Sequence, residues 1–363
     1  MYWFRIRNRR ARREDGVAEA APGWAVGQQG GERRAPRAAR LPRFRDHARD
    51  QLREQGQGKF DRMRIKFSAV FTPAQPVIRR ERFAGRTDAL ARLIGGIEDQ
   101  RLHAILYGDR GIGKTSLLHI LADTAREAGY VVLYESCDAG TGFDEMFRSV
   151  LAQIPQLYHG GTAPVDEAVA AGGSLLELAP AGELSPRLVT DLLAAVAGAR
   201  VILMLDEFDR VTSADFRRGI AELIKNLSDR CARVQLVVAG VAANFTELVA
   251  HIPSIRRNVL NLELPRMTDA EIEEIIAIGA EESGLGFSAS ARLQIRAIAH
   301  GYPYIATLLA HHAGLQAIDA RADEVSLAHV AAAVDALEAY ICPPPPGEER
   351  PMPAPVRLSA ASL

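Results

Sequence analysis

Residues 105–118, ILYGDRGIGKTSLL, most constrain the fold that this chain can adopt. An apolar run leads to Gly108, and after four variable residues Gly113, Lys114 and Thr115 open an apolar helical pattern. The stretch matches the Walker A pattern G-x-x-x-x-G-K-[ST] in its required context of strand, turn and helix. Glycines at these positions let several backbone amides face one phosphate chain, and the helix start adds its positive dipole. The sequence therefore predicts a binding site for a nucleoside triphosphate.

Two side chains of this loop are predicted to act on the nucleotide in addition to its backbone amides. Lys114 is expected to reach the β- and γ-phosphates, and the Thr115 hydroxyl is expected to ligate Mg²⁺. The residues predicted to contact the nucleotide here are Gly108, Asp109, Arg110, Gly111, Ile112, Gly113, Lys114, Thr115 and Ser116.

A second motif predicts hydrolysis. Residues 200–207, RVILMLDE, are an apolar run that ends in two carboxylates, as a buried parallel strand would. Asp206 would lie at the carboxyl end of that strand, where open α/β sheets bind ligands, and is the predicted Mg²⁺ ligand. Glu207 is the predicted general base that orients and deprotonates the attacking water. The pair gains weight because it follows the Walker A pattern by about ninety residues.

Composition separates the ends of the chain from its middle. Residues 1–66 hold 18 Lys/Arg against 8 Asp/Glu and few aliphatic residues, which predicts a disordered basic segment. Three interpretations stay open for it: nonspecific nucleic-acid binding, a tail without function, or a region that is not translated because Met63 is the start. Residues 341–363 are Pro-rich and predict a second disordered tail.

Cysteine spacing and apolar content indicate the cellular compartment. Three widely spaced cysteines without CxxC spacing argue against disulfides and zinc and favour a reducing cytoplasm. No apolar stretch approaches the ~20 residues that cross a membrane, and no signal peptide is evident.

The middle of the chain alternates as an α/β protein does, so we expect an α/β domain over 67–265 and a small all-helical lid over 266–340. Residues 155–184, rich in Gly, Ala and Pro, are expected to form a mobile insertion. The strands are expected at 102–107, 130–135, 200–206, 234–240 and 259–264. The helices are expected at 114–128, 142–154, 185–198, 213–230, 244–250, 268–282, 288–299, 303–318 and 326–339.

These motifs together resemble the AAA+ ATPases and the related STAND ATPases, and most closely the origin-recognition and helicase-loader-like group. The resemblance implies a P-loop NTPase fold with a five-stranded, mainly parallel sheet flanked by helices, followed by the lid. It covers roughly residues 80–340. Phe83-Ala84-Gly85-Arg86 is similar to the family's box before the first strand, so the resemblance implies a base or ribose contact for Arg86.

Three further assignments rest on the same resemblance. Gly301-Tyr302-Pro303 is similar to the lid's G-x-P motif, which implies a nucleotide contact for Pro303. Arg256 and Arg257 stand where the family carries an arginine finger, which in trans would require a homo-oligomer. Asn244 is the nearest candidate for sensor 1, and the lid helix offers no arginine for sensor 2.

The sequence thus predicts a Mg²⁺-dependent, ATP-binding and ATP-hydrolysing molecular switch that acts on an unidentified macromolecular partner. Its incomplete sensors imply slow turnover without that partner. One alternative is a DNA-associated loader or remodelling ATPase, although no winged-helix domain is evident after the lid. The other is an ATP-binding scaffold that does not hydrolyse.

Overall fold

The computed structural model describes residues 58–160, 172–230, 232–240 and 256–341. All of these belong to one compact unit, residues 48–363. The predicted helix 244–250, residues 1–57 of the basic segment and residues 342–363 of the tail lie outside the described residues.

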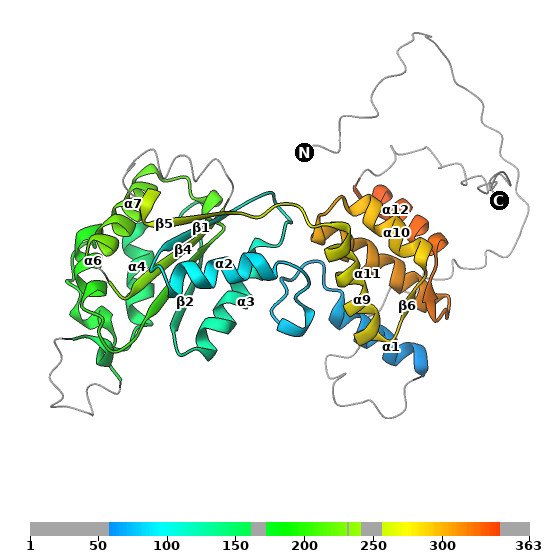
Figure 1. Cartoon of the computed structure of the whole chain (residues 1–363), viewed down its shortest axis with the longest axis horizontal. Helices are drawn as coiled ribbons and strands as arrows, with labels where there is room; N and C mark the ends of the chain where they lie inside the picture. Colours follow the sequence, from blue (N-terminus) through cyan, green and yellow to red (C-terminus); the bar gives the residue numbers. More distant parts are fainter. Residues whose placement is uncertain (1–57, 161–171, 231, 241–255, 342–363) are drawn as a thin grey trace, which may run out of the picture. The chain divides into compact units, whose positions relative to one another are not determined.

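The α/β part is built on a parallel sheet. Within the described residues its five strands lie in the order β2-β3-β4-β1-β5, and every neighbouring pair is parallel. This confirms the predicted fold class (Figure 1). Because all strands run the same way, their carboxyl ends share one edge of the sheet. The strands are β1 (His103–Tyr107), β2 (Val131–Ser136), β3 (Val201–Asp206), β4 (Val234–Gly240) and β5 (Val259–Glu263).

Alternating strand residues supply two separate cores, one on each face of the sheet. Leu203 and Leu205 of β3 face a core shared with α4 (Phe143–Ala152), α6 (Pro186–Ala194) and α7 (Ala214–Asp229). Ile202 and Met204 face the opposite core, shared with α2 (Thr87–Glu98) and α3 (Lys114–Glu127). The sheet is therefore covered by helices on both faces, which is why its strands read as continuous apolar runs.

Beyond Pro265 the chain is helical. The elements are α9 (Asp269–Ser283), α10 (Ala289–Ala299), α11 (Pro303–Asp319) and α12 (Leu327–Ile341), with a two-stranded sheet of β6 (Gly286–Phe287) and β7 (Glu324–Val325). Helix α9 begins with a capping box, in which the Thr268 side chain accepts from the Glu271 amide and the Glu271 carboxylate accepts from the Thr268 amide. Among the helices of the described residues, none has the length and hydropathy to cross a bilayer.

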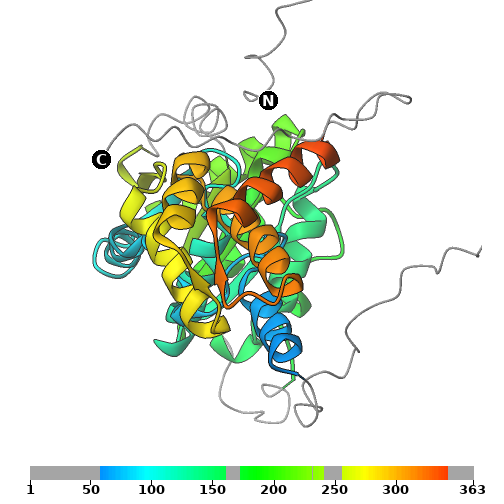
Figure 2. The same cartoon turned by 90° about the vertical axis from the view of Figure 1, so that its right-hand side faces the viewer.

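The helical cluster also contains a helix from far earlier in the chain. Helix α1 (Lys59–Val70) buries Met63 and Phe67, and with Phe71 these side chains join the core of α9–α12. Figure 2 views the molecule from the side of these helices. The boundary predicted at residue 66 differs from the structure here. The many charges around α1 lower its mean hydropathy and conceal apolar residues at helical spacing. We refer to α1 and α9–α12 together as the helical cluster.

The predicted insertion 155–184 is packed at its described ends. Short 3₁₀ turns form at Gln156–Tyr158 and Leu175–Leu178, and both Leu175 and Leu184 are fully buried in the core under α4. Residues 161–171 lie outside the described part. The expectation of mobility therefore fails for these ends, because two leucines anchor them. Two further 3₁₀ turns occur at Arg80–Arg82 and Phe208–Arg210.

Candidate functional site

The P-loop connects the carboxyl end of β1 to the first residue of α3. Gly113, the N-cap of α3, has φ 98°, a left-handed conformation that side chains disfavour. At Gly108 a Cβ would lie 2.7 Å from the Leu264 carbonyl oxygen, so only glycine fits. The loop thus curls tightly in front of the helix N-terminus, where backbone amides and the helix dipole favour an anion.

Lys114 bends back over this loop. Its Nζ donates to the carbonyl oxygens of Gly108 at 2.8 Å and Asp109 at 2.9 Å. Burial lowers the pKa of Lys114, whereas the nearby carboxylates of Asp209, Asp206 and then Asp109 act to raise it. The ion pair of Arg110 in the loop with Asp209, at 3.3 Å, places the residues after β3 close to the P-loop. The ammonium group is therefore held over the loop by two of the loop's own carbonyl oxygens.

Asp206 is almost fully buried, with 3% of its surface exposed, and both of its carboxylate oxygens have partners. Oδ2 accepts from the Tyr134 hydroxyl at 2.6 Å, and Oδ1 accepts from the Glu207 amide at 2.7 Å. Burial, followed by the bond to Asp206, raises the pKa of Tyr134 well above its usual range. Burial also raises the pKa of the neighbouring Cys137 thiol to about 12. The buried Asp206 carboxylate therefore lies beside two neutral groups.

Glu207 has a left-handed backbone, with φ 53°, at the turn that ends β3. Its Oε2 accepts from the Ser136 hydroxyl at 3.2 Å and forms an ion pair with Arg210 at 3.0 Å. Its side chain remains 38% exposed, so water can reach the carboxylate. A short turn thus presents one buried acid and one accessible acid in succession, as a metal ligand and a base would require.

Two polar bridges attach the variable residues of the P-loop to other elements. Arg110 pairs with Asp209 at 3.3 Å, across from the end of β3. Asp109 accepts from the Tyr302 hydroxyl at 2.7 Å, just before α11, and the Arg266 guanidinium lies 4.7 Å from the Tyr302 ring centre. The bond to Asp109 raises the pKa of Tyr302. The P-loop therefore contacts both the sheet edge and the helical cluster.

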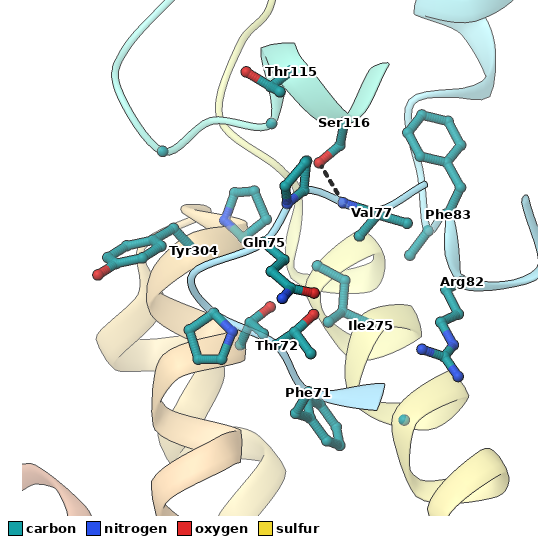
Figure 3. Close-up of a pocket in the computed structure, with 18 of the residues that line it drawn as sticks. Phe71, Thr72, Gln75, Val77, Arg82, Phe83, Thr115, Ser116, Ile275 and Tyr304 are labelled. Atoms are coloured by element: carbon teal, nitrogen blue, oxygen red, sulfur yellow. Dashed lines mark hydrogen bonds between the residues drawn. The ribbon is translucent and has the colours of Figure 1, made fainter. Parts of the chain in front are cut away.

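A cavity of about 330 Å³ opens beside the first turn of α3 (Figure 3). Its polar end is formed by P-loop residues, including Lys114 and Thr115. Its other walls are the segment 71–77, with Gln75 and Val77, and residues of α9 and α11 such as Ile275. The cavity is thus cationic at one end and largely apolar at the other, which suits a phosphate chain joined to a flat base.

The segment 71–77 was missed by the sequence analysis. It contains two prolines and no period, so the only available signal was its position ahead of the Phe83-Ala84-Gly85-Arg86 box. In the structure the Val77 amide donates to the Ser116 hydroxyl at 3.1 Å, which ties the segment to the start of α3 (Figure 3). Ser116 therefore has a partner within the chain, while its predicted contact with nucleotide remains a prediction.

Arg86 and Pro303 both line the cavity. The Arg86 guanidinium, however, donates to the carbonyl oxygens of Pro265 at 2.5 Å and Ile112 at 3.5 Å. It is buried, and burial lowers its pKa. Arg86 thus joins two backbone segments, and the predicted base or ribose contact remains a prediction. Pro303 stands beside Gly113, with its Cγ 3.8 Å from where a Cβ would lie.

The predicted arginine fingers are not part of this cavity. Arg256 and Arg257 are exposed and come just before β5, whose first residue pairs with His103 at the start of β1. The P-loop follows the other end of β1, about 16 Å away along a five-residue strand. Neither arginine can therefore join the P-loop of its own chain at this edge. Asn244 lies outside the described residues.

The residues present fit a Mg²⁺ ion held mainly by substrate. Among the described residues, no group of three or more His, Cys, Asp or Glu side chains could hold a metal by itself. The candidate ligands are one hydroxyl, Thr115, at the start of α3 and one buried carboxylate, Asp206. Mg²⁺ is usually held by one or two carboxylates together with phosphates and waters, so this donor set is compatible with Mg²⁺ bound to a nucleotide.

Comparison with known proteins agrees with this geometry. The family model described as AAA ATPase domain matches residues 75–238. The ORC1 protein of Aeropyrum pernix, solved in complex with DNA, is 21% identical over 74% of this chain and 69% of its own, with a TM-score of 0.50. Cdc6p of Pyrobaculum aerophilum is 17% identical over 74% of this chain and 70% of its own, with a TM-score of 0.52. No curated protein matches the chain. Residues 75–238 thus match the AAA ATPase domain family, and the parallel sheet and the P-loop agree with that match.

Proposed function

We propose that this protein is a Mg²⁺-dependent molecular switch that binds and hydrolyses ATP. The observation that carries the proposal is the cavity that joins the first turn of α3 to the helical cluster. ATP in this cavity would place its phosphates at the P-loop and its base among the segment 71–77 and α9. Adenine is expected rather than guanine, because the resemblance to AAA+ ATPases implies it.

Lys114 and Glu207 would have separate roles in the hydrolysis. Lys114 neutralises charge on the β- and γ-phosphates once the phosphates replace the loop carbonyls as its partners. Glu207 takes the proton from a water that attacks the γ-phosphorus in line, and its exposed carboxylate supports that role. Mg²⁺, bound by Thr115 and Asp206, would polarise the phosphates.

Hydrolysis would be transmitted through contacts between the P-loop and the helical cluster. Tyr302 is the N-cap of α11, which begins at Pro303, and the hydroxyl of Tyr302 donates to Asp109 in the loop. A change in the γ-phosphate would alter the position of the loop and hence the orientation of α11. This movement would act on a macromolecular partner.

An arginine finger would require a second copy of the chain. Because Arg256 and Arg257 precede β5, at the opposite end of the strands from the P-loop, we expect either to act only on a neighbouring P-loop. Turnover per protomer should then rise with protein concentration and fall in Arg256→Ala or Arg257→Ala. Turnover that is independent of both would remove the trans finger from the proposal.

A second candidate function is an ATP-binding scaffold that does not hydrolyse. The ion pair between Glu207 and Arg210 favours it, because Arg210 occupies the carboxylate oxygen Oε2 that would otherwise accept from an attacking water. The two candidates share the binding site and differ in the fate of the γ-phosphate.

Phosphate release with Mg·ATP separates them, measured with and without duplex DNA. Lys114→Ala should lose ATP binding, and Glu207→Gln should bind ATP but lose turnover. The matched controls are Lys225→Ala and Glu222→Gln, which change the same residue types on the exposed face of α7. A wild-type protein that binds ATP without turnover would favour the scaffold. Stimulation by DNA would favour the loader alternative.

A further inference from the structure

Tyr134 holds the buried carboxylate of the second motif. It lies on β2, the edge strand beside β3, and its backbone pairs with Met204, two residues before Asp206. Its hydroxyl donates to Asp206 Oδ2 at 2.6 Å, while the Glu207 amide donates to Oδ1 at 2.7 Å. Two donors on opposite oxygens fix the plane of a carboxylate, and only one of them is a side chain.

Tyr134 is in turn braced by α3. Its ring stacks on the ring of His119, with centroids 4.8 Å apart and planes at 16°. His119 lies four residues after Thr115 on α3, so both side chains project from the same face of that helix. The stacked rings thus link the face of α3 that carries Thr115 to the Asp206 carboxylate.

We propose that Tyr134 is a positioning residue that orients Asp206 for Mg²⁺. The inference rests on the proposed function, because it assumes that Asp206 is a metal ligand. Without the phenol hydroxyl, the Asp206 carboxylate would retain only its bond from the Glu207 amide and could rotate about its Cβ–Cγ bond. Partners that orient a metal-ligating side chain typically contribute about 10–100-fold to metal affinity.

The test is Tyr134→Phe, which removes one oxygen and keeps the ring on His119. Mn²⁺ serves as the probe, and its binding is followed by the electron paramagnetic resonance signal of the free ion, in the presence of the non-hydrolysable ATP analogue AMP-PNP. The variant should bind Mn²⁺ about tenfold more weakly. Its affinity for AMP-PNP without metal, and its melting temperature, should match those of the wild type.

Tyr130→Phe is the control, since it removes the same hydroxyl from the residue immediately before β2. It should leave Mn²⁺ affinity unchanged. If Tyr134→Phe binds Mn²⁺ as tightly as the wild type does, the positioning role is refuted while the proposed function stands. If the wild type binds no AMP-PNP, with or without Mn²⁺, the proposed function fails and the inference fails with it. A variant that loses metal-free AMP-PNP binding to the same degree would show general damage, which also overturns the inference.

Discussion

Replacing Gly314 by alanine should destabilise the helical cluster through one side chain of α1. A Cβ at position 314 would lie 1.9 Å from Cζ of Phe67. Carbon atoms in contact stay about 3.5–4.0 Å apart, so the ring would have to move by about 2 Å. Phe67 is fully buried and packs on Phe71 with ring centroids 4.8 Å apart, which leaves it little room.

The magnitude follows from two opposing terms. Alanine in place of glycine inside a helix stabilises by about 0.5–1 kcal/mol. Overpacking a core costs about 1–3 kcal/mol, and losing a buried Phe ring costs about 3–5 kcal/mol. Net of the alanine gain, overpacking alone leaves a loss of about 0–2.5 kcal/mol, and complete loss of the ring's packing leaves a loss of about 2–4.5 kcal/mol. Because the ring must move by about 2 Å, we expect Gly314→Ala to lower the free energy of unfolding by about 2–3 kcal/mol, where the two ranges meet. At roughly 2–4 °C per kcal/mol, the melting temperature should fall by about 4–12 °C.

Thermal and urea unfolding, followed by circular dichroism, would measure this loss. Gly95→Ala is the matched control within α2, where the nearest neighbour of an added Cβ is Asp99 Oδ2 at 3.6 Å. Gly95→Ala should raise the free energy of unfolding by about 0.5–1 kcal/mol. In a Phe67→Ala background, Gly314→Ala should become neutral or stabilising. The packing argument is refuted if Gly314→Ala is as stable as the wild type, or if its cost is the same in both backgrounds.

Three further predictions concern buried or bridging side chains. Burial lowers the pKa of His103 to about 4. Because the unfolded chain protonates at about pH 6.5, stability should be full above pH 6.5 and fall by up to about 3 kcal/mol between pH 6.5 and 4. His103→Asn should flatten that dependence in urea titrations, and an unchanged slope would contradict it. Tyr302→Phe removes the bond to Asp109 and should weaken AMP-PNP binding about two- to tenfold by fluorescence titration, whereas an equal Kd would contradict this. Lysine at position 86 cannot reproduce the planar donor set of Arg86, so Arg86→Lys should lower the free energy of unfolding by about 1–3 kcal/mol in thermal melts. An unchanged melting temperature would show that Arg86 does not stabilise the fold by joining the Pro265 and Ile112 carbonyls.

The P-loop and the strands could be predicted because their signals are local. Glycine spacing reports backbone curvature within six residues, and a buried parallel strand is apolar on both faces. The predicted strand 200–206 therefore differs from β3 by one residue at its start. The positions of the strands and of the helices after Pro265 followed from the same kind of evidence, whereas the five-stranded sheet followed from the family resemblance.

Helix α1 shows where composition misleads. Its sequence, KFDRMRIKFSAV, places Phe60, Met63 and Phe67 at helical spacing, so a periodicity test would have found the helix. The net positive charge of residues 1–66 hid that period. Its partners could not have been found this way, because Phe67 meets Gly314 only through the tertiary fold.

The polar partners of the site are likewise tertiary. From the sequence alone, Tyr134 is simply an aromatic residue in a predicted strand. The register of β2 against β3 brings its hydroxyl to Asp206. The ion pair between Glu207 and Arg210 depends on a left-handed turn at Glu207, which no propensity favours for glutamate. Sequence motifs thus identify which residues carry the chemistry, whereas the groups that orient them come from neighbouring strands and turns.

The position of α1 gives the site a property that neither motif contains. Since α1 packs in the core of α9–α12, the chain passes between the helical cluster and the α/β part twice, once at 71–86 and once at 264–267. Both passages reach the P-loop: the Val77 amide bonds to Ser116, and the Leu264 carbonyl lies against Gly108. Arg86 joins them, because its guanidinium donates to Pro265 on the second passage and to Ile112 in the loop. A nucleotide in the cavity would contact both passages at once. Its binding would therefore favour one arrangement of the two passages, which the buried Arg86 guanidinium already joins.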